Sequence, residues 1–275
     1  MLTLKAALEE ATAAIGRVEA QVIIAHLLGV NRAYLVANPL RVLTETEDAR
    51  VDMMVSQRAA GQPVAYLLGK REFYSRDFTV GPDVLIPRPE TEVLVELALA
   101  KLRPKSSPSI LDLGTGSGAI ALTLACERPD ARVTATDASR PALDVARANA
   151  AALACAGRVR FLEGSWYAPL AGERFDVIVA NPPYVAAGDA HLATGDLRFE
   201  PGGALTDGSA DGLDSIRAIV AGAPGHLAPG GWLLLEHGFD QSEPVRQLLI
   251  AAGFTERASI PDLAGIPRVA GGTVK

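Results

Sequence analysis

The sequence predicts an α/β fold in which a doubly wound sheet follows a small helical domain at the N-terminus. Three observations predict it. Apolar residues in the first seventy positions recur at helical spacing, helix and strand patterns alternate after Thr91, and the glycine loop Gly114–Gly118 stands between a strand and a helix. Near-continuous apolar strands over 175–180 and 232–235 favour a parallel sheet that helices cover on both faces.

The first seventy residues are predicted to form helices. Apolar side chains recur there at spacings of three and four, as at Leu4, Ala7 and Ala11. The pair Thr44 and Glu47 matches a capping box, in which a threonine oxygen and a glutamate three residues later satisfy exposed amides at a helix start. We therefore expect a first domain over 1–70. The glycines expected to close its helices are Gly16, Gly29 and Gly61.

Residues 71–90 are expected to connect the two domains. Aromatic and β-branched residues from Glu72 to Ile86, interrupted by Gly81-Pro82-Asp83, predict short strands with a turn. Pro87 and Pro89 fix their own φ angles and favour extended geometry before them, so we expect a stiff segment that holds Arg88 outward. On these grounds the segment is equally consistent with a rigid linker and with a substrate contact.

Residues 91–275 are expected to form the sheet domain. The alternating patterns predict helices over 91–103, 118–127, 140–154, 211–222 and 241–252. They predict strands over 109–113, 132–136, 158–162, 174–180, 230–236, 254–260 and 267–271.

Composition limits the classes of function. The chain of 275 residues has a formal net charge of −6, and residues 1–75 hold 8 basic and 8 acidic side chains while the remainder holds 18 and 24. Neither part is a basic module, so we expect no stable DNA binding. The sequence has neither a signal-peptide pattern nor an apolar run of membrane-spanning length, which predicts a cytoplasmic protein with no membrane association. The histidines are scattered and the cysteines Cys126 and Cys155 lie in helical patterns, so we expect no metal site and buried thiols.

The glycine loop predicts a nucleotide-type ligand. The predicted strand 109–113 runs into Gly114-Thr115-Gly116-Ser117-Gly118, where glycine allows a ligand to approach the backbone closely. A dehydrogenase loop would carry a further glycine where Ala119 stands. Asp137 ends the next strand, where a carboxylate can bind both hydroxyls of a ribose, although an acidic residue there often caps a helix instead. Trp166 follows the third strand and is expected to stack beside an adenine at the same rim.

The segment Asn181-Pro182-Pro183-Tyr184 is expected to carry the chemistry. It follows the strand 174–180 and so reaches the same rim as the glycine loop. The Asn181 side-chain carbonyl and the Pro182 main-chain carbonyl are two acceptors that can hold both N–H groups of a planar NH₂ and leave its nitrogen lone pair free. The prolines stiffen these acceptors, and Tyr184 offers a flat face to the planar group. Such a site suits methyl transfer by alignment and requires no strong base.

The residues alone leave the methyl acceptor open. A side-chain amide and the exocyclic amine of a flipped adenine both present a planar NH₂. A third hypothesis is a non-catalytic ligand-binding protein on the same fold, because fold alone does not establish activity. The acidic charge balance favours an amide over an adenine, and the intact Asn181 segment favours catalysis. Glu200 and Glu236 are interpreted as structural hydrogen-bonding groups near the site.

With these motifs assembled, the sequence resembles the peptide chain release factor N5-glutamine methyltransferase family over nearly its whole length. The matching segments are Ile86–Glu92, Leu111–Leu122, Asn181–Tyr184, Arg198–Pro201, Leu233–Gly238 and Asp262–Gly265. The resemblance implies a class I, Rossmann-like methyltransferase that transfers a methyl group from S-adenosyl-L-methionine to the glutamine side-chain N5 of the Gly-Gly-Gln motif in release factors. It places the protein in translation termination, with release factors as its partners.

The resemblance also implies roles for individual residues. In the family the glycine loop and the positions of Asp137, Trp166 and Asn181 contact the cofactor, while Asn181–Tyr184 also grips the glutamine amide. The stretch containing Arg88 and Glu90 faces the release factor, and residues 1–70 form a helical substrate-recognition domain. One residue departs from the pattern, because Ser165 stands where the family usually has aspartate, which puts a carboxylate contact to the adenine amine in doubt.

Overall fold

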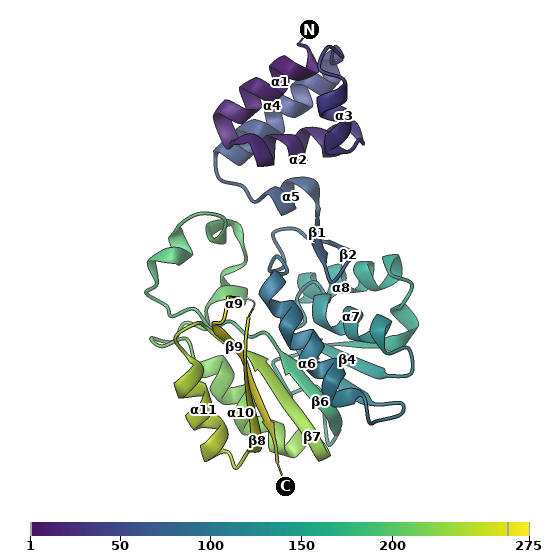
Figure 1. The fold of residues 1–275 in the computed structure, drawn as a ribbon. Helices are drawn as coiled ribbons and strands as arrows, with labels where there is room; N and C mark the ends of the chain where they lie inside the picture. Colours follow the sequence, from purple (N-terminus) through teal and green to yellow (C-terminus); the bar gives the residue numbers. More distant parts are fainter. Residues whose placement is uncertain (1, 263, 275) are drawn as a thin grey trace. The chain divides into compact units, whose positions relative to one another are not determined.

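The computed structural model describes residues 2–262 and 264–274, so that Leu263 of the matching segment Asp262–Gly265 lies outside the described residues. The chain divides into two compact units, residues 1–70 and residues 71–275 (Figure 1). Cys155 is buried as expected, whereas Cys126 is only partly buried. Among the described residues, no helix combines the length and apolar character that a membrane crossing demands.

The first unit consists of packed helices. Their bounds are α1 Leu4–Ile15, α2 Arg17–Leu28, α3 Arg32–Ala37, α4 Glu45–Ala59 and α5 Val64–Leu68. The capping box is confirmed, since Thr44 Oγ1 accepts from the Glu47 amide at 3.2 Å and Glu47 Oε2 accepts from the Thr44 amide at 2.9 Å. Gly16 and Gly29 end α1 and α2 with positive φ angles, which glycine adopts without strain. Apolar faces of α1, α2 and α4 meet in the core of this unit.

A hairpin opens the second unit, and its turn differs from the expectation. Strands β1 (Lys70–Phe73) and β2 (Arg76–Thr79) pair across Tyr74 and Ser75, whose φ angles are 51° and 57°. The segment 81–84 is a second turn, and the described residues between it and η1 (Pro89–Thr91) form no strand. The earlier turn forms without glycine because tertiary contacts hold it. Glu92 Oε1 accepts from the Tyr74 amide at 2.8 Å, and the buried rings of Phe73 and Phe78 pack edge to face.

The main sheet has the predicted doubly wound topology (Figure 1). Its strands lie in the order β5-β4-β3-β6-β7-β9-β8, with β9 antiparallel to both neighbours and the other pairs parallel. The strands are β3 Ser109–Leu113, β4 Arg132–Asp137, β5 Val159–Glu163, β6 Phe175–Ala180, β7 Leu227–Glu236, β8 Thr255–Pro261 and β9 Pro267–Thr273. The helices between them are α6 Glu92–Leu102, α7 Ala119–Glu127, α8 Arg140–Ala152, α9 Gly202–Leu205, α10 Asp214–His226 and α11 Ser242–Ala251, with short 3₁₀ helices η1 Pro89–Thr91, η2 Ala156–Arg158, η3 Ala190–Ala193 and η4 Leu197–Phe199.

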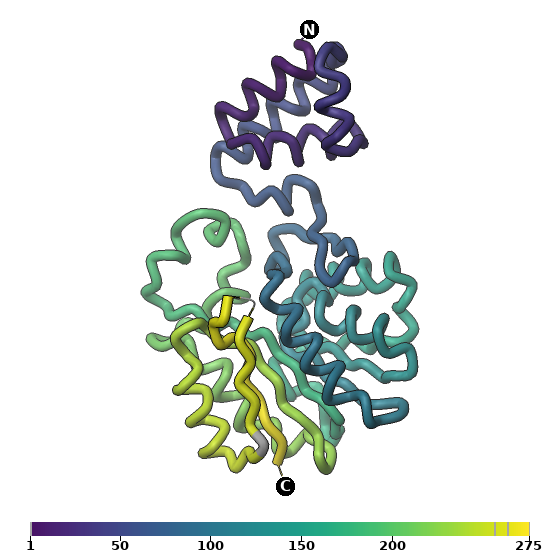
Figure 2. Tube along the Cα trace, in the orientation of Figure 1, coloured from purple at the N-terminus to yellow at the C-terminus, as the bar shows by residue number. Residues whose placement is uncertain are grey.

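Two apolar layers cover the sheet, one on each face. Alternate residues of one strand enter different layers, so that Val177 and Val179 face α6 and α7 while Ile178 and Ala180 face α10. This alternation follows from the strand period of two, and it explains why the central strands are apolar throughout. Figure 2 shows the long connection after β6 as an arch outside the sheet before the chain returns to α9.

Candidate active site

A cavity of about 640 Å³ lies at the carboxyl ends of the central strands, within the second unit. The loop after β3 supplies Gly114–Ser117, the end of β4 supplies Asp137, and the loop after β6 supplies Asn181 and Pro183. The connections from β3 and β6 leave these adjacent strands in opposite directions along the sheet. Such a switch point is where open α/β sheets bind ligands, and the volume is typical of small-molecule sites.

The glycine loop presents main chain to the cavity. Gly114, Gly116 and Gly118 have φ angles of 71°, 55° and 83°, a region that residues with a Cβ rarely adopt. A Cβ on Gly118 would lie 2.9 Å from Leu122 Cδ1 and 3.2 Å from Ala146 Cβ, so a side chain there would have to displace its neighbours. The Thr136 carbonyl accepts from the Gly114 and Thr115 amides, both at 2.9 Å, and thereby ties the loop to β4.

Two buried polar residues support this loop. Asp112 Oδ2 accepts from Thr115 Oγ1 at 2.6 Å and from the Ala121 amide at 3.2 Å, and burial raises the pKa of Asp112 to about 7. Asn149 of α8 donates to the carbonyls of Ser117 and Thr79 and accepts from the Thr79 amide. The sequence interpretation did not single out either residue. A polar residue within the apolar run of β3 was the available signal for Asp112.

Asp137 lines the cavity with both carboxylate oxygens anchored. Its Oδ2 accepts from the Gly116 amide and its Oδ1 from the Ser139 amide, each at 2.8 Å. Burial raises the pKa of Asp137, and these amide hydrogen bonds oppose the shift. Because each carboxylate oxygen has a second lone pair, Asp137 can still accept from two hydroxyl groups of a ligand.

Trp166 packs against the glycine loop at the same rim. Its φ angle of 47° is unusual for a bulky residue, and a Cβ on Gly114 would lie 3.4 Å from its ring. The indole and Ser165 both line the cavity, as a stacking position beside an adenine requires. A Cβ at 3.4 Å would make an ordinary van der Waals contact, so the positive φ angle of Gly114, and not the space beside the indole, favours glycine there.

The segment Asn181–Tyr184 divides between cavity and interior. Asn181 and Pro183 line the cavity, whereas Pro182 is buried. The Tyr184 hydroxyl donates to Glu236 Oε1 at 3.1 Å, and burial, followed by the charge of Glu236, raises the pKa of Tyr184. Asn181 Nδ2 donates to Thr91 Oγ1 at 3.3 Å, and the Thr91 hydroxyl donates to Glu236 Oε2 at 2.7 Å. The carboxylate of Glu236 is thus joined to both polar side chains of the segment.

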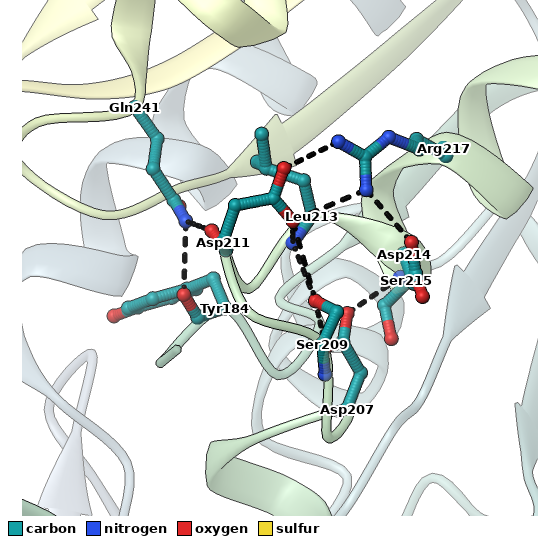
Figure 3. Close-up of polar contacts among 9 residues, drawn as sticks. All are labelled: Tyr184, Asp207, Ser209, Asp211, Leu213, Asp214, Ser215, Arg217 and Gln241. Carbon is teal, nitrogen blue, oxygen red and sulfur yellow. Dashed lines mark hydrogen bonds and ion pairs between the residues drawn. The ribbon is translucent and has the colours of Figure 1, made fainter. Parts of the chain in front are cut away.

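The main chain of Tyr184 is held by the side chain of Gln241 (Figure 3). Gln241 Nε2 donates to the Tyr184 carbonyl at 3.0 Å and to the Asp211 carbonyl at 2.9 Å, while its Oε1 accepts from the Gly238 amide at 2.9 Å. A Cβ on Gly212 would lie 2.2 Å from the Tyr184 carbonyl oxygen, so only glycine allows this approach. The loop between α9 and α10, which carries Asp211 and Gly212, is stabilised by hydrogen bonds and ion pairs among polar side chains. Figure 3 draws them for Asp207, Ser209, Asp211, Asp214, Ser215 and Arg217.

Arg88 is not held outward, contrary to the expectation from its flanking prolines. Its guanidinium pairs with Glu200 Oε1, and 32% of its side chain is exposed. Glu200 Oε2 accepts from the Ile86 amide at 2.9 Å, and the Glu200 side chain is wholly buried. A buried carboxylate without a cation would carry a large desolvation penalty, which explains the inward turn of Arg88. Glu90 is exposed.

Glu200 and Glu236 are therefore structural hydrogen-bonding groups near the site, as the sequence suggested. Within residues 2–262 and 264–274, no three His, Cys, Asp or Glu side chains come together in a potential metal site.

Family models match both units. A model described as the PrmC N-terminal domain matches residues 3–69, and a model described as a methyltransferase small domain matches residues 90–201. These matches correspond to the helical unit and to the part of the sheet unit that contains the glycine loop, Asp137 and Asn181.

Curated relatives match over almost the whole chain. The release factor glutamine methyltransferase of Burkholderia pseudomallei is 55% identical, covering 92% of this chain and 90% of the relative. The protein of the same name from Xylella fastidiosa (strain Temecula1) is 52% identical, covering 96% and 95%. Among solved structures, a 16S rRNA methyltransferase of T. thermophilus in complex with AdoMet and guanosine shares the fold, with a TM-score of 0.55, 22% identity, and coverage of 75% of this chain and 50% of that one.

Proposed function

Because the chain belongs to the release factor glutamine methyltransferase family, we propose that its cavity binds S-adenosyl-L-methionine and that Asn181–Tyr184 holds the glutamine amide that it methylates. The protein is an enzyme that transfers a methyl group to the side-chain nitrogen of a release factor glutamine. The observation that carries our assignment of the site is the meeting of the glycine loop and Asn181 in one cavity.

The cofactor half of the cavity fits S-adenosyl-L-methionine. Asp137 has free lone pairs for the two ribose hydroxyls, Trp166 offers a face to the adenine, and the main chain of Gly114–Gly118 leaves space for close approach. Ser165 offers a hydroxyl at the same rim. When bound, the cofactor supplies a methyl group activated by a positively charged sulfur.

The amide half of the cavity aligns the acceptor nitrogen. The lone pair of an amide nitrogen is delocalised into its carbonyl, so the nitrogen is a poor nucleophile. We assign the Asn181 side-chain oxygen and the Pro182 main-chain oxygen as acceptors for the two N–H groups, which leaves the lone pair directed at the methyl carbon. Pro183 limits the motion of the segment, and Tyr184 packs against the apolar layer that faces α10. As the new N–C bond forms, the bond between the methyl carbon and the sulfur breaks and its electron pair stays on the sulfur. The nitrogen gains positive charge and releases one proton to solvent.

Release factors are the proposed partners, and residues outside the cavity are assigned to their recognition. The helical unit exposes several large apolar side chains, including Val36 at 67% and Leu40 at 80%, which suits a surface that contacts protein. We assign residues 1–70 to substrate recognition, and we assign Arg88 and Glu90, which lie between the cavity-lining Pro87 and Thr91 in the sequence, to contact with the release factor. Since release factors act in translation termination, we place the enzyme in the cytoplasm.

A methyl-transfer assay tests this function. The purified protein is incubated with labelled S-adenosyl-L-methionine and, separately, with an unmodified release factor, with the same factor carrying a replaced motif glutamine, and with unmethylated DNA. We expect label on the unmodified release factor alone. Label on DNA and none on the release factor would favour adenine methylation and overturn the proposal.

A further inference from the structure

We propose that Glu236 is a positioning residue, whose carboxylate acts through the Thr91 hydroxyl to fix the direction of the Asn181 amide. This inference rests on the proposed function, in which Asn181 must present an acceptor to the substrate. The three side chains come from the end of β7, from η1 and from the end of β6, and they form a continuous hydrogen-bonded chain. We call this chain, Glu236 to Thr91 to Asn181, the relay.

The first step of the relay is set by the carboxylate. Glu236 is buried, and each of its oxygens accepts from one hydroxyl, Oε2 from Thr91 at 2.7 Å and Oε1 from Tyr184 at 3.1 Å. Burial raises the pKa of Glu236, and the hydrogen bonds from Thr91 and Tyr184 oppose this shift because they stabilise the ionised carboxylate. Both hydroxyls donate to Glu236, and the ionised carboxylate that accepts them has no proton to donate in return.

The second step follows from the hydroxyl of Thr91. A hydroxyl has one proton and two lone pairs, and the proton of Thr91 is used by Glu236. Toward Asn181, the Thr91 oxygen can then act only as an acceptor. It faces the Asn181 Nδ2 at 3.3 Å, in agreement with this requirement.

The third step concerns the substrate. With its NH₂ turned to Thr91, Asn181 presents its carbonyl oxygen to the cavity that it lines. A reversed amide would place an N–H donor against the N–H donors of the glutamine, which leaves donors unpaired and misdirects the nitrogen lone pair. Through the relay, Glu236 determines which Asn181 atom faces the substrate, although Glu236 itself does not line the cavity.

Threonine variants at position 91 test the relay. Thr91→Val keeps the shape but removes the hydroxyl, and we expect kcat to fall roughly 10- to 100-fold. The KM for the release factor and the Kd for S-adenosyl-L-methionine should each stay within about threefold, because Thr91 lines the cavity but is only 4% exposed. Thr91→Ser restores a hydroxyl and should recover most of kcat. Thr123→Val is the matched control, since Thr123 is buried in α7 and its hydroxyl has no partner among the described residues.

Glu236→Gln tests the origin of the direction. Glutamine keeps the size but offers one acceptor and one NH₂ group, so one of the two hydroxyls meets a donor. We expect a fall in kcat comparable to that of Thr91→Val. The double variant should be no slower than Thr91→Val alone, because both changes break the same chain.

The outcomes separate the inference from the proposed function. If the wild type methylates the release factor and Asn181→Ala lowers kcat, but Thr91→Val keeps kcat within twofold, only the relay is wrong. A loss of cofactor affinity and melting temperature in Thr91→Val that matches its loss of kcat, with no recovery in Thr91→Ser, would show a merely structural role and also overturn the relay. Failure of the wild type itself to modify the glutamine would overturn the proposed function instead.

Discussion

The two halves of the cavity are built differently. The cofactor half is local in sequence: Gly116 and Asp137, which bond directly, are 21 residues apart, and the loop uses mainly main-chain groups. The amide half joins side chains that are 90 and 145 residues apart, Asn181 with Thr91 and Thr91 with Glu236. A site built from main chain tolerates changes in nearby side chains, whereas a site built from side chains depends on each partner. The following experiments test this difference.

The largest effect is expected at the base of the cofactor half and is one of stability. Burial raises the pKa of Asp112 to about 7, so the folded protein keeps a proton that the unfolded chain has lost above about pH 4. The stability that comes from this retained proton is fully present below about pH 4 and is lost as the pH rises to about 7. Its size is on the order of a few kcal/mol. Urea unfolding of wild type and Asp112→Asn between pH 4 and 8 measures it.

The quantity to compare is the difference between the two unfolding free energies, because other carboxyl groups contribute equally to both proteins. As the pH rises from 4 to 8, we expect the free energy of unfolding of the wild type to fall relative to that of Asp112→Asn. A difference that stays constant with pH would contradict a raised pKa at Asp112.

Asn181→Ala should show how strongly the amide half depends on one side chain. Removal of the acceptor leaves an N–H of the substrate unpaired, and we expect a loss of about 1–3 kcal/mol of transition-state stabilisation, seen as a fall in kcat. Calorimetric titration with S-adenosyl-L-methionine should show a smaller loss of cofactor affinity. Unchanged turnover would remove Asn181 from the catalytic site.

Asp137→Asn should give the opposite pattern in the cofactor half. Asparagine offers one oxygen to the amides of Gly116 and Ser139, so one amide and one ribose hydroxyl lose an acceptor. We expect S-adenosyl-L-methionine to bind about 1–2 kcal/mol more weakly, with kcat at saturating cofactor nearly unchanged.

The matched control is Glu163→Gln, because Glu163 is the exposed neighbour of Asp137 in the register of β4 and β5. This variant should bind the cofactor as the wild type does. A fall in kcat at saturating cofactor in Asp137→Asn, without a change in Kd, would contradict the separation of the two halves.

The smallest effect is expected from Ser165→Asp. The resemblance to the family leads us to expect aspartate at this position, and a carboxylate would accept more strongly than a hydroxyl from the adenine amine. We expect a gain of about 0.5–1 kcal/mol in cofactor affinity, measured by the same titration, and no change in kcat. Weaker binding in Ser165→Asp would indicate that Ser165 does not face the adenine.

Local sequence patterns predicted most of the second unit because its elements are set by short-range rules. Strand β3 has the predicted bounds, and α7, β4 and β6 differ by one residue, since glycine loops and apolar runs mark them clearly. The hairpin turn at Tyr74 and Ser75 was missed because its positive φ angles are held by Glu92 and by packed phenylalanines. Local turn chemistry favoured Gly81–Asp83 instead.

The sequence by itself determined the fold class, the family and the motifs at the carboxyl ends of the strands, because each of these depends on contiguous residues and on periodicity. Only the tertiary structure decided how side chains from distant elements pair. It turned Arg88 inward to Glu200, because the ion pair offsets the desolvation of that buried carboxylate, and it joined Glu236 to Asn181 through Thr91. Such pairings arise when the completed sheet brings strand ends together, and no local pattern encodes which of the meeting polar atoms will bond.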